Sequence, residues 1–223
     1  MAEKPKEPHK ISRLAHSAAR ASPFVNRAEA GRRLAARLAR FRRKAPVVLA
    51  LPRGGVPVAA EVASALGAPL DLVLVRKIGV PFRRELAMGA VADGGAPITI
   101  RNDDVIAMFG IGEDVFERAR DQELQEIERR RTLYLGGRTA AALEGKTAIV
   151  VDDGVATGAT TRAALRAVRA RHPAALVLAV PVAPSDVLPS LQAEADETIC
   201  LDPEPFLGAI GFYYRDFSQV SDA

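Results

Sequence analysis

The chain is poor in the residues on which several common kinds of site depend. Its 223 residues include one cysteine, three histidines and no tryptophan. The single Cys200 excludes an internal disulfide, and no cysteine or histidine pair has the spacing of a zinc site. The histidines lie apart at positions 9, 16 and 172, which leaves little room for a histidine-based metal site or catalytic triad.

Long hydrophobic runs are also lacking. The longest, residues 174–184, has 11 residues and is far too short to cross a bilayer. The first ten residues, MAEKPKEPHK, lack the apolar stretch of a secretory signal, so we expect a cytoplasmic protein without membrane contact. Hydrophobic residues nevertheless make up 48% of the chain, which is enough for a core and excludes wholesale disorder.

Positive charge is concentrated at the start of the chain. Residues 1–44 hold 13 lysines and arginines but three acidic residues, whereas the remainder is mildly acidic. Residues 1–44 therefore carry a formal charge of +10 and the remaining residues carry −6, which together give the net charge of +4. Clustered lysine and arginine can bind nucleic-acid phosphates, so residues 1–44 leave a nucleic-acid partner open.

The composition divides the chain into a tail and one domain. Residues 1–22 are polar and lack a sustained apolar period, which predicts a flexible basic tail. We expect the domain to span residues 23–223. It begins with a helix over 27–43, where Asn26 and Glu29 form an imperfect capping box.

Apolar runs and helical patterns then alternate. We expect strands at 47–51, 72–75, 147–151, 176–180 and 198–201, a hairpin of strands at 88–92 and 98–100, and helices up to residue 66 and at 103–109, 113–134, 158–171 and 186–193. This order predicts an α/β fold, a parallel central sheet flanked by helices. Because ligands bind beyond the carboxyl ends of such strands, the loops after Leu51, Val75 and Val151 should line one crevice.

The most informative segment is AIVVDDGVATGATT, residues 148–161. A buried strand ends in Asp152 and Asp153, and a loop of small residues then opens a helix. The loop lets backbone N–H groups approach an anion, and the helix N-terminus adds partial positive charge. The arrangement suits a monophosphate beside two acids that accept hydrogen bonds from vicinal hydroxyls. A capped helix with solvated acids is the plain structural alternative.

This segment closely resembles the signature of the type I phosphoribosyltransferases, which bind phosphoribosyl pyrophosphate (PRPP). The resemblance implies that Asp152 and Asp153 hold the ribose 3′- and 2′-hydroxyls. It also assigns the 5′-phosphate to a loop of five residues: Ala156, Thr157, Gly158, Ala159 and Thr160. The 6-oxopurine enzymes have an aspartate where this chain has Ala156, so this departure weakens a hypoxanthine, guanine or xanthine assignment.

Two further segments follow predicted strands and carry arginine, lysine and glycine. Arg53, Gly54 and Gly55 stand where these enzymes have their pyrophosphate loop, and two glycines there allow close approach to a ligand. The stretch RKIGVP, residues 76–81, is similar to one that precedes the flexible catalytic loop of the adenine enzymes. By this resemblance Arg76 and Lys77 contact pyrophosphate, although an ordinary basic surface loop is the alternative.

The same resemblance gives candidates for acid/base and base-binding residues. Glu85 lies in the expected mobile hood, residues 82–93, and is a candidate acid/base because the adenine enzymes use a loop glutamate. Phe206 stands in an aromatic C-terminal stretch that loosely resembles the base-proximal part of the purine enzymes, so it is a candidate to stack on a planar base. A solvated glutamate and a packing aromatic are the alternatives.

Residues 101–140 have no counterpart that we can assign in the small classical enzymes. They resemble the helical insert of a poorly characterised bacterial subgroup of phosphoribosyltransferase-domain proteins. The resemblance as a whole implies a type I phosphoribosyltransferase-like fold with a small hood and this helical insert, and a homodimer. It also implies Mg²⁺ held mainly by PRPP and water.

The sequence thus predicts a phosphoribosyltransferase of nucleotide metabolism. It would transfer the 5-phosphoribosyl group from PRPP to a nitrogenous acceptor, expected to be a nucleobase, with release of pyrophosphate. The alternative is a non-catalytic PRPP-sensing regulator that binds nucleic acid through residues 1–44. A PRPP hydrolase or a transferase for another acceptor also stays open, because one sequence does not identify the acceptor.

Overall fold

The main sheet is parallel. The computed structural model describes residues 24–93, 97–136 and 138–221, and its strand order in this sheet is β2-β1-β6-β7-β8. The strands are β1 (Pro46–Ala50), β2 (Leu70–Leu72), β6 (Thr147–Val151), β7 (Ala175–Pro184) and β8 (Glu197–Glu204). Both β1 and β6 are buried along their whole length, which explains their continuous apolar sequences. The predicted α/β fold is confirmed, while the predicted tail over 1–22 lies outside the described residues.

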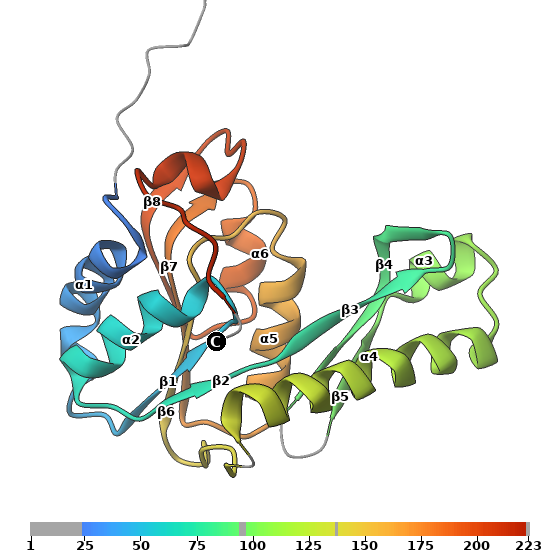
Figure 1. Ribbon diagram of the computed structural model, residues 1–223, viewed down its shortest axis with the longest axis horizontal. Helices are drawn as coiled ribbons and strands as arrows, with labels where there is room; N and C mark the ends of the chain where they lie inside the picture. Colours follow the sequence, from blue (N-terminus) through green and yellow to red (C-terminus); the bar gives the residue numbers. More distant parts are fainter. Residues whose placement is uncertain (1–23, 94–96, 137, 222–223) are drawn as a thin grey trace, which may run out of the picture.

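Helices cover both faces of this sheet (Figure 1). One face packs against α1 (Arg27–Leu38) and α2 (Gly55–Leu66), and the other against α5 (Ala159–Arg169) and α6 (Leu188–Gln192). Short 3-10 helices, η1 and η2, cover Ala39–Phe41 and Ile210–Tyr213. At the start of α1 the Asn26 side chain accepts a hydrogen bond from the Glu29 N–H, as the capping pattern predicted.

A second sheet and two helices form an arm that extends away from the main sheet (Figure 1). The arm comprises β3 (Val75–Val80), β4 (Arg83–Ala92), β5 (Ile98–Arg101), α3 (Asp103–Met108) and α4 (Glu113–Leu135). Its strands are antiparallel in the order β3-β4-β5. A cluster of buried residues that includes Ile78, Met88 and Phe116 joins α4 to this sheet. Both helices of the predicted insert are therefore present, and they pack on the hairpin.

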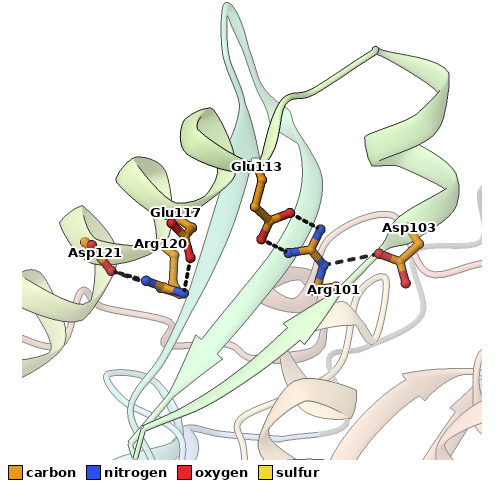
Figure 2. A network of polar contacts seen from close by, with 6 residues as sticks. All are labelled: Arg101, Asp103, Glu113, Glu117, Arg120 and Asp121. Atoms are coloured by element: carbon orange, nitrogen blue, oxygen red, sulfur yellow. Dashed lines mark hydrogen bonds and ion pairs between the residues drawn. The ribbon is translucent and has the colours of Figure 1, made fainter.

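Ion pairs link the last strand of the arm to its two helices, as Figure 2 shows. Arg101 at the end of β5 donates to both carboxylate oxygens of Glu113, at 2.7 and 3.0 Å, and also to Asp103 at 3.2 Å. The hydrogen bonds from Arg101 lower the pKa of Glu113. These pairs are exposed, so each contributes little to stability, but the two-point contact orients α4 on β5.

The expectation that residues 76–81 follow a strand is wrong. Arg76 and Lys77 lie inside β3 rather than after a strand, and the strand expected at 72–75 is divided between β2 and β3. Similarly, Glu85 lies in β4, so the segment expected as a loop hood is a strand in this structure. Gly79, where the β3–β4 register shifts, and Pro81 interrupt the alternation that would have indicated a strand.

Candidate functional site

The two acids that follow β6 have different surroundings. Asp153 is buried, and its Oδ2 accepts a hydrogen bond from Arg27 Nε at 2.8 Å. Asp152 is half-buried, and its Oδ1 accepts one from the Asp153 N–H at 2.8 Å. Burial and the neighbouring Asp153 carboxylate raise the pKa of Asp152 well above its ordinary value. The pair therefore combines one carboxylate held by an arginine with one that is costly to ionise.

The loop after β1 lies directly against these acids. The Leu51 N–H donates to the Val151 carbonyl at 2.9 Å, so the loops after β1 and β6 leave the sheet together. A β-carbon placed on Gly54 would lie 2.1 Å from Asp153 Oδ2, and one on Gly55 would lie 2.7 Å from the Val151 carbonyl oxygen. Only glycine fits at these two positions. The predicted pyrophosphate loop and the predicted acid pair are thus in contact.

The predicted phosphate loop ends at the N-terminus of α5. Ala156 and Thr157 are exposed, and Gly158 adopts the left-handed conformation with φ 74° immediately before the helix. No side chain caps this helix, so its first N–H groups are available to an anion. The helix dipole adds a favourable potential for negative charge. This geometry suits a phosphate group.

Lys77 and Arg76 border the same groove but differ in their ion pairing. The groove has a volume of about 790 Å³, lies between the arm and the start of α5, and is lined by both residues together with Phe82 and Thr160. Arg76 Nε donates to Glu123 Oε2 of α4 at 2.7 Å. Among the described residues Lys77 has no ion pair, whereas Arg76 is engaged within the arm. Both side chains therefore border the groove beside Thr160, and Arg76 is in addition paired with α4.

The last two predicted site residues, Phe206 and Glu85, lie outside the loops that follow β1 and β6. Phe206 lies in the segment after β8 and is 92% exposed. That segment continues to Ile210, which covers Gly154 beside the acid pair. Glu85 lies in β4, and its side chain is outside what the structure describes. No contact links Phe206 to the acids within the described residues, so its predicted role rests on the resemblance alone.

Sequence reasoning missed the residues that surround Asp153 from the two ends of the domain. Besides the Arg27 contact, the Tyr214 hydroxyl donates to the Asp153 carbonyl at 2.6 Å. Burial and the nearby Asp153 carboxylate raise the pKa of Tyr214, so its hydroxyl stays a donor. The position of Arg27 in the sequence gave one indication of this contact. An arginine at the first position of a helix is unfavourable beside the positive end of the helix dipole, which favours a carboxylate partner from another part of the chain.

Four of the eight lysines and arginines in residues 24–44 form ion pairs with acids of the described chain. Besides Arg27, three arginines of this region form ion pairs with acids: Arg32 with Glu61, Arg33 with Glu29 and Arg40 with Glu197. This pairing reduces the positive potential that a nucleic acid would meet on residues 24–44. Residues 1–23, where the rest of the basic segment lies, are outside the described part of the chain.

The described residues hold neither a cluster of metal-binding side chains nor a helix that could span a membrane. Across residues 24–93, 97–136 and 138–221, no three or more histidine, cysteine or acidic side chains gather as a metal site would need. Within the same residues no helix has the length and apolar character to span a membrane.

Comparisons with known proteins agree with the motif. A family model described as "Phosphoribosyl transferase domain" matches residues 25–215. The Mycobacterium tuberculosis (strain H37Rv) protein named "Putative phosphoribosyl transferase Rv0571c" is 46% identical over 199 residues. The match covers 89% of this chain and 44% of that protein, so the chain spans less than half the length of this curated relative.

A solved structure is similar over nearly its whole length. The crystal structure of the protein TT1426 from Thermus thermophilus is 42% identical in sequence and has a TM-score of 0.77. The match covers 89% of this chain and 93% of TT1426. The arrangement described above is therefore similar to one that has been observed by crystallography.

Proposed function

The chain belongs to the phosphoribosyl transferase domain family, and from this premise we propose that it binds PRPP and transfers the 5-phosphoribosyl group to a nitrogenous acceptor with release of pyrophosphate. One observation carries the proposal. The acid pair, the glycine loop after β1 and the uncapped start of α5 meet at the carboxyl edge of the parallel sheet. These three elements match the ribose, the diphosphate and the 5′-phosphate of one PRPP molecule.

In this proposal each part of PRPP has its own partners. The carboxylates of Asp152 and Asp153 accept hydrogen bonds from the ribose hydroxyls. The loop from Ala156 to Thr160 binds the 5′-phosphate through its N–H groups and hydroxyls. The loop of Arg53, Gly54 and Gly55 and the side chain of Lys77 stabilise the departing diphosphate. Arg76 would join them only by leaving Glu123.

Transfer proceeds by attack of an acceptor nitrogen on C1 of the ribose as the bond to the diphosphate oxygen breaks. The reaction passes through an oxocarbenium-like state, so the protein contributes mainly position and charge. Diphosphate oxygens and water are the ligands that Mg²⁺ prefers, so PRPP and water would hold most of the ion. Bound Mg²⁺ would neutralise diphosphate charge.

The acceptor is proposed to be a planar nitrogenous base. Its support is the aromatic segment that follows β8, which covers Gly154 with Ile210 and carries Phe206 and Phe212 as exposed side chains. Stacking of a base on an aromatic ring contributes about 1–3 kcal/mol. Glu85 remains the candidate acid/base on β4.

A pyrophosphate-release assay tests the proposal. The protein is incubated with PRPP and Mg²⁺ and with adenine, guanine, hypoxanthine, xanthine, uracil or orotate, and one reaction omits the acceptor. Pyrophosphate release that depends on one base supports the transferase, and release without any base indicates a PRPP hydrolase. Silence across the panel, with PRPP still bound, would favour a PRPP-sensing regulator or an acceptor of another class.

A further inference from the structure

The side chain of Arg27 is held on several sides. Its Nε donates to Asp153 Oδ2 at 2.8 Å, and its Nη1 donates to the Ser218 carbonyl at 2.8 Å. The guanidinium carbon lies 3.8 Å from the centre of the Phe217 ring, which is within cation–π distance. The side chains of Arg27 and Asp153 are only 11% and 10% exposed. The arginine is therefore fixed in one orientation against the carboxylate.

Backbone pairing fixes the two segments that supply these contacts. The Phe24 N–H donates to the Tyr213 carbonyl at 3.1 Å, and the Arg215 N–H donates to the Phe24 carbonyl at 3.0 Å. We name residues 24–27 and 213–218 the terminal clasp. Its two halves come from opposite ends of the domain, and both reach Asp153: one through Arg27 and the other through the Tyr214 hydroxyl.

Stability alone is a weak reason for this arrangement. A buried ion pair gains little over an apolar pair of the same volume, because both charges must leave water. An arginine in the first turn of α1 also opposes the helix dipole. The contact does have one specific effect. It engages Asp153 Oδ2 and stops the carboxyl group from turning, which sets the direction of its second oxygen, Oδ1.

We propose that Arg27 is a positioning residue for the PRPP site: held by the terminal clasp, it fixes the Asp153 carboxylate so that Oδ1 faces a ribose hydroxyl. This inference rests on the proposed function, because it assigns Asp153 to the ribose. It extends the site to the two ends of the domain. Residues 213–218 then contribute to substrate binding through their contacts with Arg27 and Asp153.

The charge of Arg27 also gives the proposal a distinctive readout. The charged or titratable groups that act on the acid pair, or on Tyr214 beside it, are Arg27 and Glu29 of α1 and Tyr214 of the C-terminal segment. The positive charge of Arg27 lowers the pKa of Asp152, against the larger effects of burial and Asp153. Removing that charge raises the pH at which Asp152 loses its proton, and hence the pH below which PRPP binding fails.

The test is calorimetric titration of PRPP with Mg²⁺ across pH, for wild type, Arg27→Gln, Arg27→Lys and the matched control Arg32→Gln. Arg32 lies on the same helix and pairs with Glu61 at an exposed position. We expect Arg27→Gln to bind PRPP about 10- to 100-fold more weakly, as small misplacements in a site do. Its acid limit should move to higher pH, Arg27→Lys should restore that limit, and Arg32→Gln should match wild type.

Three outcomes separate the claims. If wild type does not bind PRPP, the proposed function fails, and this inference with it. If wild type binds and Arg27→Gln binds equally well with the same pH limit, the inference alone is overturned. Should Arg27→Gln fail to fold, Phe217→Ala replaces it, because that change loosens the guanidinium and keeps both charges. Several-fold weaker binding at an unchanged pH limit supports the proposal, and unchanged affinity contradicts it.

Discussion

The α-carbon of Gly54 lies against the carboxylate of Asp153, so closely that a β-carbon there would be 2.1 Å from Oδ2. The two residues are 99 positions apart in the chain, yet their loops are in direct contact. This contact joins the proposed diphosphate loop to the proposed ribose acid. It follows that changes to the backbone of the first loop should be felt by the second.

Replacing Gly54 by alanine should impair the site more than the fold. The added methyl group must displace either the Asp153 carboxylate or the loop after β1, so we expect PRPP affinity to fall about tenfold or more. Calorimetric titration and thermal unfolding measure the two effects. Gly112→Ala is the control, because its β-carbon would meet only the Asp114 side chain at 2.9 Å, on the arm. Equal affinities in the two variants would contradict the contact.

Asp152→Asn should stabilise the ligand-free protein near neutral pH. The folded state raises the pKa of Asp152 above its ordinary 3.8, so the folded protein holds the proton more tightly than the unfolded chain. Stability therefore falls as pH rises through the range between these two pKa values. Asparagine carries no charge and escapes this loss, and each kcal/mol gained raises the Tm of a domain of this size by about 2–4 °C.

Thermal unfolding as a function of pH checks this expectation. The difference in Tm between Asp152→Asn and wild type should be largest near pH 7 and should shrink toward pH 4. A variant that is less stable than wild type at pH 7 would show that burial and the Asp153 carboxylate do not destabilise the charged form of Asp152.

Gly158→Ala should weaken binding of the 5′-phosphate. The left-handed backbone at Gly158 costs an alanine about 1–2 kcal/mol, and the β-carbon would lie 2.7 Å from Val187 Cγ1. Gly110→Ala is matched for strain, with φ 58° and no atom within 4 Å of its β-carbon. Both variants should lose stability, but only Gly158→Ala should bind ribose 5-phosphate more weakly. A similar loss of ribose 5-phosphate affinity in Gly110→Ala would place the phosphate elsewhere.

Substitutions of Lys77 and Arg76 should differ in their effects on pyrophosphate affinity. Lys77→Met removes a charge that borders the groove beside Thr160, so Mg²⁺–pyrophosphate affinity should fall about 10- to 100-fold with little change in Tm. Arg76→Met breaks the ion pair with Glu123 and should mainly loosen α4 on the arm. Titration of pyrophosphate into both variants decides this. A larger loss of affinity in Arg76→Met would mean that Arg76 leaves Glu123 when ligand binds.

The parts of the fold that could be predicted from the sequence are those whose signals are local. The unit from Thr147 to Arg169 could be predicted because its signals are local: a continuous apolar strand, two acids, small loop residues and an amphipathic helix. The β3–β4 hairpin was missed because Gly79 and Pro81 interrupt the alternation along it. Contacts such as Arg27–Asp153, which are 126 residues apart, depend on tertiary packing and leave no local pattern.

The most direct test of the account is calorimetric titration of PRPP with Mg²⁺ into wild type and Asp152→Asn at pH 7.5, with Glu117→Gln on the arm as control. Loss of hydrogen bonds to a charged group should reduce the affinity of Asp152→Asn about 10- to 100-fold or more, while Glu117→Gln binds like wild type. Unchanged affinity in a folded Asp152→Asn protein, or no binding by wild type, would contradict the assignment of this edge of the sheet to PRPP.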